Sequence, residues 1–295
     1  GIRDVERSRG LGDVYKRQTK ENTLEKAFSG VDIVFHTAAL INLDRRYRDL
    51  IRLVNVEGTR NVCEAALNSS VKKMIHFSSV DAFYRFPIEE PLYEDRKLID
   101  DPNAMPYDLS KADGNRVVLD YCSKGLDASI IHPTSIVGPN DFKIGILMHE
   151  LIKIANGKRR VIPDFGYNFI DARDLSRTAI SAVEHGKAGQ NYLVGGEYCM
   201  FLKISEFISE QLGRKTVLAT VPDFVTYLPL PFEYIKSLIK KEPRVITLDS
   251  IHTGQTGNYF IPSTLAREEL GHISRPIKET VNDTIDFFVS RGLIK

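Results

Sequence analysis

A tyrosine and a lysine four positions apart, Tyr107 and Lys111, are well suited to proton transfer. On a helix, residues four apart lie on one face within a few ångströms of each other. The ordinary pKa of a tyrosine is about 10, too high for a general base at neutral pH, but a neighbouring cation favours the phenolate and lowers that pKa. The pair is therefore a candidate proton shuttle, although most such pairs are ordinary surface neighbours.

Two serines, Ser78 and Ser79, end the apolar run over residues 73–79. If this run is a strand of a parallel sheet, both side chains project at its carboxyl edge, where such folds bind ligands. A hydroxyl group there can donate to a developing oxyanion. The alternative is that the serines merely end a strand and begin a turn. Because Tyr107 lies on the following predicted helix, the catalytic interpretation and the structural one are almost equally supported.

Strand-like and helix-like patterns alternate around these residues. Apolar runs over residues 32–39, 73–79 and 128–133 predict strands, and the first has the continuous pattern of a strand buried on both faces. Helical patterns lie between them, through residues 54–66 and 110–124. This order implies parallel crossovers and therefore an α/β fold with a doubly wound parallel sheet.

After Gly138 we expect the sheet to finish at Val194 and helices to form a small C-terminal substrate lobe, punctuated by prolines. The predicted domains are residues 19–197, which hold the sheet, and 198–295, mainly the lobe. The further elements predicted are helices over 144–156, 174–184, 203–212, 224–240 and 277–289 and strands over 160–163 and 191–194.

The amino-acid composition limits the classes of protein to which this chain can belong. The chain has 295 residues, of which 42% are hydrophobic and 27% charged, the mix of a globular protein with a sizeable core. A net charge of +1 gives no positive excess for nucleic-acid binding. No apolar run reaches the roughly 18 residues of a membrane span. Three scattered cysteines, Cys63, Cys122 and Cys199, indicate reduced thiols in a cytoplasmic protein.

The first 18 residues form a separate case. Residues 8–18 resemble one reading frame of a transposase adapter used to prepare sequencing libraries, and they have neither a signal peptide's apolar core nor any periodicity. We expect residues 1–18 to be a non-native leader that replaces the natural N-terminus. The alternative is a genuine disordered arm. A short helix ending near Phe28 and closed by Gly30 follows.

Several motifs occur in one order along the chain. They lie at residues 31–39, 55–61, 78–79, 107–111, 132–141, 169–174, 270–271 and 275–280. In this order and at these separations the sequence resembles the extended short-chain dehydrogenase/reductases, closest to the group of dihydroflavonol 4-reductase, cinnamoyl-CoA reductase and 3β-hydroxysteroid dehydrogenase. The resemblance implies a Rossmann-like fold and covers nearly all of residues 19–293.

The resemblance also implies roles for residues. Tyr107 is expected to be the catalytic acid/base, Lys111 to lower its pKa and bind the nicotinamide ribose, and Ser79 to polarise the substrate carbonyl. Asn55 is expected to hold a water of the proton relay or, as readily, to be a polar residue satisfied by nearby backbone. The expected cofactor-binding residues are Thr37, Ala38, Ala39, Ser78, Tyr107, Lys111, Pro133, Thr134 and Ile136.

Other polar residues are interpreted as structural. In the motif that holds Asp171, Arg173 and Asp174, we expect these residues to fix the sheet to the substrate lobe, with Asp174 capping the following helix. His36 and His132 lie inside strand patterns, where buried and hydrogen-bonded histidines are common. No metal site is expected.

The sequence departs from the family at its start. The family opens with a strand and a glycine-rich turn, G-x-x-G-x-x-G, that binds the cofactor pyrophosphate at a helix N-terminus, and this sequence has no such turn. We therefore expect a chain that lacks the first βαβ region of the sheet, binds NAD or NADP poorly, and leaves apolar side chains uncovered. Those side chains are Ile33, Phe35, Ile75 and Phe77.

The function expected of the full-length parent is NAD(P)-dependent reduction of a ketone or aldehyde, or oxidation of the matching alcohol. Aromatic and aliphatic residues over 83–93, 142–147 and 224–234 favour an apolar substrate. One alternative is an NDP-sugar epimerase or dehydratase, which needs basic side chains against a diphosphate. A second is a non-catalytic cofactor-binding or scaffold protein. For the sugar-nucleotide alternative, the basic side chains that could bind the diphosphate are Lys143, Lys158, Arg159 and Arg160.

The resemblance to the family also implies a homodimer that associates through the two long helices.

Overall fold

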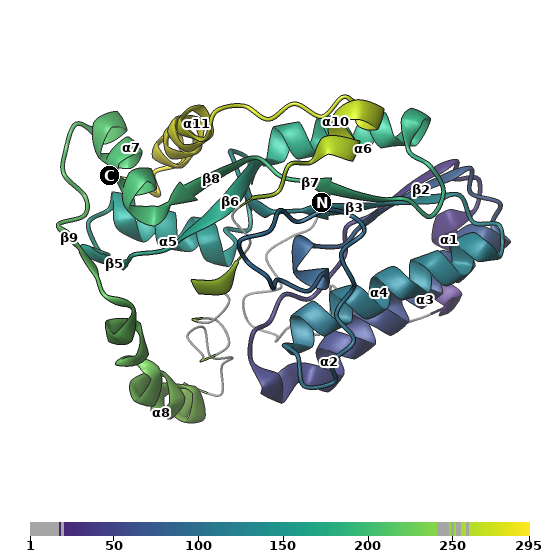
Figure 1. Ribbon diagram of the computed structural model, residues 1–295, viewed down its shortest axis with the longest axis horizontal. Helices are drawn as coiled ribbons and strands as arrows, with labels where there is room; N and C mark the ends of the chain where they lie inside the picture. The colour runs from purple at the N-terminus through teal and green to yellow at the C-terminus, as the bar shows by residue number, and fades with distance from the viewer. Residues whose placement is uncertain (1–17, 19–20, 241–247, 249–250, 252–254, 258–259) are drawn as a thin grey trace. The chain divides into compact units, whose positions relative to one another are not determined.

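The computed structural model describes Gln18 and residues 21–240, 248, 251, 255–257 and 260–295 (Figure 1). The chain divides into two compact units. The first holds the chain up to Tyr84 together with residues 94–132 and 179–192, and the second holds residues 85–93, 133–178 and 193–295. The leader predicted over residues 1–18 lies outside the described residues except for Gln18, which is buried and donates from its amide to the Val54 carbonyl oxygen, 2.9 Å away.

A four-stranded sheet has the order β1–β2–β3–β7. Its strands are β1 (Ile33–His36), β2 (Lys73–Phe77), β3 (Ala128–Pro133) and β7 (Asn191–Val194). β1 pairs parallel with β2, and β2 parallel with β3. The prediction of a parallel α/β sheet is therefore confirmed, and β3 and β7 have the predicted bounds.

Helices of the first unit pack on one another beside this sheet. They are α1 (Glu21–Phe28), α2 (Arg48–Arg52), a π-helix (Leu53–Glu57), α3 (Gly58–Asn68) and α4 (Pro106–Ser123). α3 contacts both α1 and α4. Their apolar faces meet side chains of β2 and β3 in one core, which includes Val62, Ala66, Met74, Val118 and Ile130.

The helix that carries Tyr107 begins four residues earlier than predicted. Pro106 occupies its first turn, a position that suits proline because its fixed φ angle is helical and its missing N–H group would be unpaired there. Tyr107 and Lys111 therefore both lie on the regular part of α4, and the predicted shared helix face exists.

The prediction that the first strand is buried on both faces is wrong. Ile33 is 42% exposed and Phe35 44% exposed, whereas His36 is buried. β1 is the terminal strand of the sheet in the part of the chain that the structure describes, so these two side chains alternate onto a face that no described helix covers. The expected exposure of Ile75 is also wrong, because Ile75 is fully buried in the adjacent β2.

Strands of the second unit form two further sheets. β4 (Ser135–Val137), β6 (Gly166–Asp171) and β8 (Glu197–Met200) make one, and β5 (Val161–Pro163) pairs with β9 (Ala219–Val221) in the other. β-structure therefore continues beyond Val194, where it was predicted to finish.

Helices α5 (Ile146–Ala155), α7 (Phe201–Leu212) and α11 (Ile277–Ser290) surround the core of this unit. α6 (Ala172–His185), α8 (Leu230–Lys240) and α10 (Thr264–Leu270) are its other helices. The helix predicted over residues 224–240 is interrupted: a 3₁₀ helix, Asp223–Tyr227, precedes α8, and Pro229 lies between the two. The buried side chains of the core include Leu151, Ile154, Phe169, Ile208, Ile285 and Phe288.

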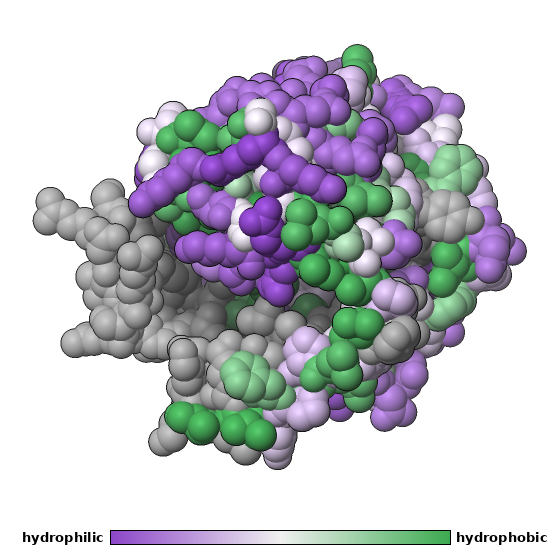
Figure 2. All heavy atoms as spheres, turned by 90° about the vertical axis from the view of Figure 1, so that its left-hand side faces the viewer, coloured by the Kyte–Doolittle hydropathy of each residue, from purple (hydrophilic) through white to green (hydrophobic). Residues whose placement is uncertain are grey.

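Three helices of the second unit, α5, α7 and α11, end at one place. Asn156, which follows α5, donates to the carbonyl oxygen of Leu293 at 2.8 Å, and Arg214, which follows α7, donates to that of Ala155 at 3.0 Å. The last carbonyl groups of a helix carry partial negative charge, which cations such as Arg214 offset. Figure 2 shows hydrophilic side chains gathered on this face, where Lys158 and Arg214 line a cavity of about 320 Å³.

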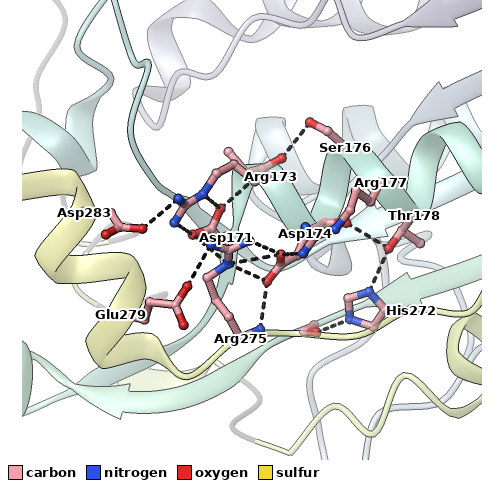
Figure 3. Close-up of polar contacts among 12 residues, drawn as sticks. Asp171, Arg173, Asp174, Ser176, Arg177, Thr178, His272, Arg275, Glu279 and Asp283 are labelled. Carbon is pink, nitrogen blue, oxygen red and sulfur yellow. Dashed lines mark hydrogen bonds and ion pairs between the residues drawn. The ribbon is translucent and has the colours of Figure 1, made fainter. Parts of the chain in front are cut away.

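An ion-pair network joins β6, α6 and α11 (Figure 3). The buried carboxylate of Asp174 accepts from the backbone N–H group of Arg275 at 2.8 Å and from its guanidinium group at 2.9 Å. Arg173 pairs with both Asp171 and Asp283, each at 2.7 Å. The predicted cap is misassigned, because Asp171, not Asp174, precedes α6 and accepts from the backbone N–H group of Arg173.

Candidate active site

Tyr107 and Lys111 lie one turn apart on α4, and both side chains are buried. The Lys111 ammonium donates to the carbonyl oxygen of Phe77, the last residue of β2, at a distance of 2.9 Å. Tyr107 is hydrogen-bonded to the side chain of Ser79. The structure therefore brings together the three predicted catalytic residues, Ser79, Tyr107 and Lys111.

Ser79 follows β2 and caps the 3₁₀ helix Val80–Ala82. Its hydroxyl oxygen accepts from the backbone N–H group of Asp81 at 3.2 Å and donates to the Asp81 carboxylate at 3.1 Å. The sequence analysis overlooked Asp81. Its signal was an acidic residue two positions after a serine, the pattern of a helix cap with a charged first turn.

Charges and burial set the protonation states of this cluster. Burial raises the pKa of Tyr107 above its ordinary value of 10, and the carboxylates of Asp81 and Asp108 raise it further. The phenol is therefore protonated at neutral pH, whereas the sequence predicted a lowered pKa. Burial lowers the pKa of Lys111 to about 8, with Asp81 acting in the opposite direction, so the ammonium form still prevails at pH 7.

Asn55 has the structural role that the sequence left open. Its carboxamide oxygen accepts from the backbone N–H group of Leu40 at 2.7 Å, and its amide nitrogen donates to the Leu40 carbonyl oxygen and to the hydroxyl oxygen of Ser110. Both amide hydrogens are thus used within the protein, and Asn55 fixes the loop after β1 against α4. Asn55 lies in the π-helix, a feature often found at functional sites.

The other predicted cofactor-binding residues are distributed over both units. Thr37 and Ala38 are exposed just after β1, which ends at His36 rather than at Ala39. Ser78 is buried and donates to the Lys111 carbonyl oxygen at 3.4 Å.

Pro133, Thr134 and Ile136 belong to the second unit. Pro133 ends β3 and is buried, whereas Ile136 in β4 is 44% exposed. The Thr134 hydroxyl is buried without a hydrogen-bond partner among the described residues, which is unusual for a buried polar atom.

The buried histidines are hydrogen-bonded, as predicted. The Nδ1 atoms of His36 and His76 lie 3.0 Å apart, and His132 Nδ1 lies 3.0 Å from the carbonyl oxygen of Ser79. Burial lowers the pKa of His36 to about 3 and that of His132 to about 4. Within the described residues, no group of histidine, cysteine and carboxylate side chains could hold a metal ion.

A nicotinamide ribose fits the residues of the first unit. An ammonium group has three N–H donors, and among the described residues that of Lys111 has only the Phe77 carbonyl oxygen as a hydrogen-bond partner. Its other donors can bind ribose hydroxyl groups beside Tyr107. The pyrophosphate half of a dinucleotide has no such match, because the sequence contains no G-x-x-G-x-x-G turn.

The parallel sheet with flanking helices and the family comparison define an oxidoreductase of the short-chain dehydrogenase/reductase class, which uses NAD or NADP. A family model described as the NAD dependent epimerase/dehydratase family matches residues 10–195, and the chain belongs to this family. The family and the Rossmann-like fold expected from the sequence are thus confirmed.

Several relatives match over most of the chain. Sterol demethylase protein B of Methylococcus capsulatus is 27% identical over 292 residues, which cover 97% of this chain and 86% of the relative. A putative dihydroflavonol 4-reductase of Synechocystis is 25% identical, with 93% and 81% covered. The solved structure of gox2253 is 30% identical with a TM-score of 0.79, covering 94% of this chain and 84% of its own.

Sugar-nucleotide enzymes share the fold. The dTDP-glucose 4,6-dehydratase DesIV of Streptomyces venezuelae, solved with NAD and TYD bound, has a TM-score of 0.71 at 20% identity, with 93% of this chain and 79% of DesIV covered.

No helix in the described part of the chain has the length and apolar character needed to cross a bilayer.

Proposed function

We propose that this chain reduces the carbonyl group of a ketone or aldehyde, or oxidises the matching alcohol, with Ser79, Tyr107 and Lys111 as its catalytic residues. The observation that carries the proposal is the buried cluster in which the side chain of Tyr107 meets that of Ser79, with Lys111 one helical turn from Tyr107 on α4. A hydroxyl donor, a proton donor and a cation are the groups that a carbonyl reduction requires.

The raised pKa of Tyr107 suits the reducing direction. The protonated phenol gives its proton to the carbonyl oxygen as that oxygen becomes negative, and the Ser79 hydroxyl donates a hydrogen bond to the same oxygen. A bound NADH or NADPH supplies the hydride that the carbonyl carbon accepts. Lys111 holds the ribose hydroxyl groups, and its positive charge stabilises the phenolate that remains on Tyr107 until solvent returns a proton.

An apolar substrate is the class that we favour. Phe86, Tyr93 and Phe142 are 58%, 44% and 64% exposed, and exposed aromatic side chains of this kind support an apolar ligand. Relatives are named for sterols, dihydroflavonols and cinnamoyl-CoA, and two Arabidopsis thaliana relatives are 3beta-hydroxysteroid-dehydrogenase/decarboxylases. Each of these names denotes a compound with an apolar or aromatic part, although cinnamoyl-CoA also carries the polar coenzyme A group.

The test is steady-state turnover of NADH or NADPH with a 3-ketosteroid, a dihydroflavonol and an aromatic aldehyde. Tyr107→Phe and Lys111→Ala should each abolish turnover while the circular dichroism spectrum and melting temperature stay close to those of the unchanged chain. Full turnover by Tyr107→Phe would refute the assigned role. Cofactor binding without turnover of any carbonyl would instead favour the non-catalytic alternative.

Sugar-nucleotide epimerisation or dehydration is the second candidate, supported by the shared fold of DesIV. The basic residues that would bind a diphosphate are partly occupied: Arg159 is paired with Glu150 at 2.7 Å, and Lys158 lies where three helices end. Conversion of UDP-glucose or dTDP-glucose, with no reduction of the apolar carbonyls, would favour this candidate.

We also propose a cytoplasmic location and a homodimer through the two long helices α3 and α4. Three free thiols, Cys63, Cys122 and Cys199, support a reducing compartment. Sedimentation equilibrium should give twice the monomer mass, and a monomer at all concentrations would refute the dimer.

A further inference from the structure

The carbonyl oxygen of Ser79 accepts two hydrogen bonds. One comes from the backbone N–H group of Ala82 at 3.1 Å, and the other from the Nδ1 atom of His132 at 3.0 Å. One residue earlier, Ser78 still donates from its backbone N–H group to the Ile131 carbonyl oxygen of β3 at 2.8 Å. The His132 side chain thus continues the attachment to β3 where the main chain of Ser79 leaves the sheet.

His132 is itself held on its other side. Its side chain has no solvent exposure, and its ring packs edge-on against Phe83 with ring centres 4.8 Å apart. The Nε2 atom lies 2.9 Å from the side-chain oxygen of Asn191, which also accepts from the Asn115 amide at 3.0 Å. The side-chain oxygen of Asn115 is buried without a partner in the described part of the chain.

The hydrogen bonds fix the tautomer. A carbonyl oxygen only accepts, so His132 Nδ1 carries the hydrogen. Burial lowers the pKa of His132 to about 4, so the ring is neutral and Nε2 must accept. Turning the two side-chain amides, whose oxygen and nitrogen ends are assigned from their partners, lets Asn191 donate both to Nε2 and to the unpaired oxygen of Asn115. Asn191 is then the donor that holds the acceptor nitrogen Nε2 of His132.

We propose that His132 is a positioning residue, which Asn191 and Asn115 hold in its Nδ1–H tautomer and which fixes the Ser79 hydroxyl against Tyr107. The inference rests on the proposed function, because it concerns the group that holds the substrate oxygen. A displacement of about 1 Å in a catalytic group costs on the order of 100-fold in rate. A single buried hydrogen bond to the Ser79 carbonyl can therefore govern turnover without touching the substrate.

Two substitutions of similar size distinguish the hydrogen bond made by Nδ1 of His132 from the one made by Nε2. In His132→Asn the amide nitrogen can take the place of Nδ1 and keep the bond to Ser79, whereas in His132→Gln the amide group reaches the place of Nε2 and keeps the bond to Asn191. The control is His272→Gln, which alters a buried histidine whose Nε2 bonds the Gly195 carbonyl oxygen at 2.8 Å in the second unit.

With the carbonyl substrates above, kcat should fall 10- to 100-fold in His132→Gln and at most about threefold in His132→Asn, with the KM for cofactor unchanged in both. His272→Gln should keep the kcat of the unchanged chain. Equal loss in the two His132 variants, or none in His132→Gln, would overturn the inference.

A spectroscopic measurement tests the inference even if no substrate is turned over. In chains labelled with ¹³C at the tyrosine ring carbon that bears the hydroxyl, the Tyr107 signal, assigned by its loss in Tyr107→Phe, reports the bond to Ser79. It should move in His132→Gln and stay in His132→Asn. An unmoved signal in both variants would refute the positioning role, whereas absence of turnover in the unchanged chain would refute only the proposed function.

Discussion

The Ser79 hydroxyl both accepts from the Asp81 backbone N–H group and donates to the Asp81 carboxylate, at 3.2 and 3.1 Å. A residue that caps a short helix is thereby tied to a negative charge beside Tyr107. For Ser79 to hold a substrate oxygen, its hydrogen must turn from Asp81 towards that oxygen. Asp81 therefore influences both the direction of the serine hydroxyl and the acidity of the tyrosine.

Asp81→Asn should lower the pKa of Tyr107, because the carboxylate that disfavours the phenolate is removed. If protonated Tyr107 is the proton donor, the alkaline limb of the pH–rate profile for reduction should move to lower pH by about one unit. The measurement is kcat against pH. Asp113→Asn, which removes a half-buried partner of Arg116, is the control and should leave the limb in place.

Acid should destabilise the first unit through its buried histidines. The pKa of His36 is lowered from 6.5 to about 3 by burial, so below pH 6.5 the unfolded chain binds a proton that the folded chain cannot. The stabilisation present above pH 6.5 is therefore lost as the pH falls, by about 2 kcal/mol for such a histidine at pH 5. Urea unfolding of the unchanged chain at pH 7.5 and pH 5 measures the total loss.

His36→Gln should show a smaller loss between these two pH values, because it removes one of the groups that must stay neutral. His149→Gln alters an exposed histidine and should show the same loss as the unchanged chain. A free energy of unfolding that does not fall at pH 5 would mean that the buried histidines do not control acid stability.

Arg275→Met should destabilise the second unit by about 3–5 kcal/mol, because it leaves the buried carboxylate of Asp174 without its main cation. Lys203→Met breaks an exposed pair with Glu206 and should cost far less, because exposed ion pairs contribute little to stability. Chemical denaturation of both variants gives the comparison. Equal costs would show that the network in Figure 3 contributes no more than surface pairs do.

Phe35→Lys should reduce association of the chain beyond the homodimer proposed through α3 and α4. Phe35 and Ile33 are exposed on β1, and exposed apolar side chains on a terminal strand favour pairing with other chains, which a charge opposes. Sedimentation velocity over a concentration series is the measurement. Ile180→Lys replaces an equally apolar residue of α6 that is 64% exposed, and it should leave association unchanged. An unaltered concentration dependence in Phe35→Lys would exclude β1 as the associating surface.

The local sequence pattern predicted those strands whose side chains are nearly all buried. The continuous apolar runs of β3 and β7 gave their bounds, because nearly every side chain in them is buried. The apolar run of β1 by itself predicted burial on both faces, because such a run reads the same whether or not another element covers its second face. The exposure of Ile33 and Phe35 was expected only from the absence of the family's opening motif. The short strands β4, β8 and β9 have three or four residues each, too few for a periodic pattern.

Within the candidate site, the placement of Tyr107 and Lys111 on one helix face could be predicted from the sequence, because a helix fixes the positions of residues four apart. The direction of the Tyr107 pKa shift could not be predicted, because it depends on burial and on Asp81, which the spacing does not reveal. The neighbours of His132, namely Asn115 and Asn191, are 76 residues apart, and no local signal links them.

The π-helix before α3 has a genetic consequence. A π turn accommodates one residue more than an α turn, and each residue of an α-helix accounts for about 100° of rotation. Deletion of a single codon between residues 53 and 57 would restore α geometry and turn Asn55 away from Leu40 and Ser110. Such a mutation would loosen α4, and with it Tyr107 and Lys111, while leaving every catalytic codon intact.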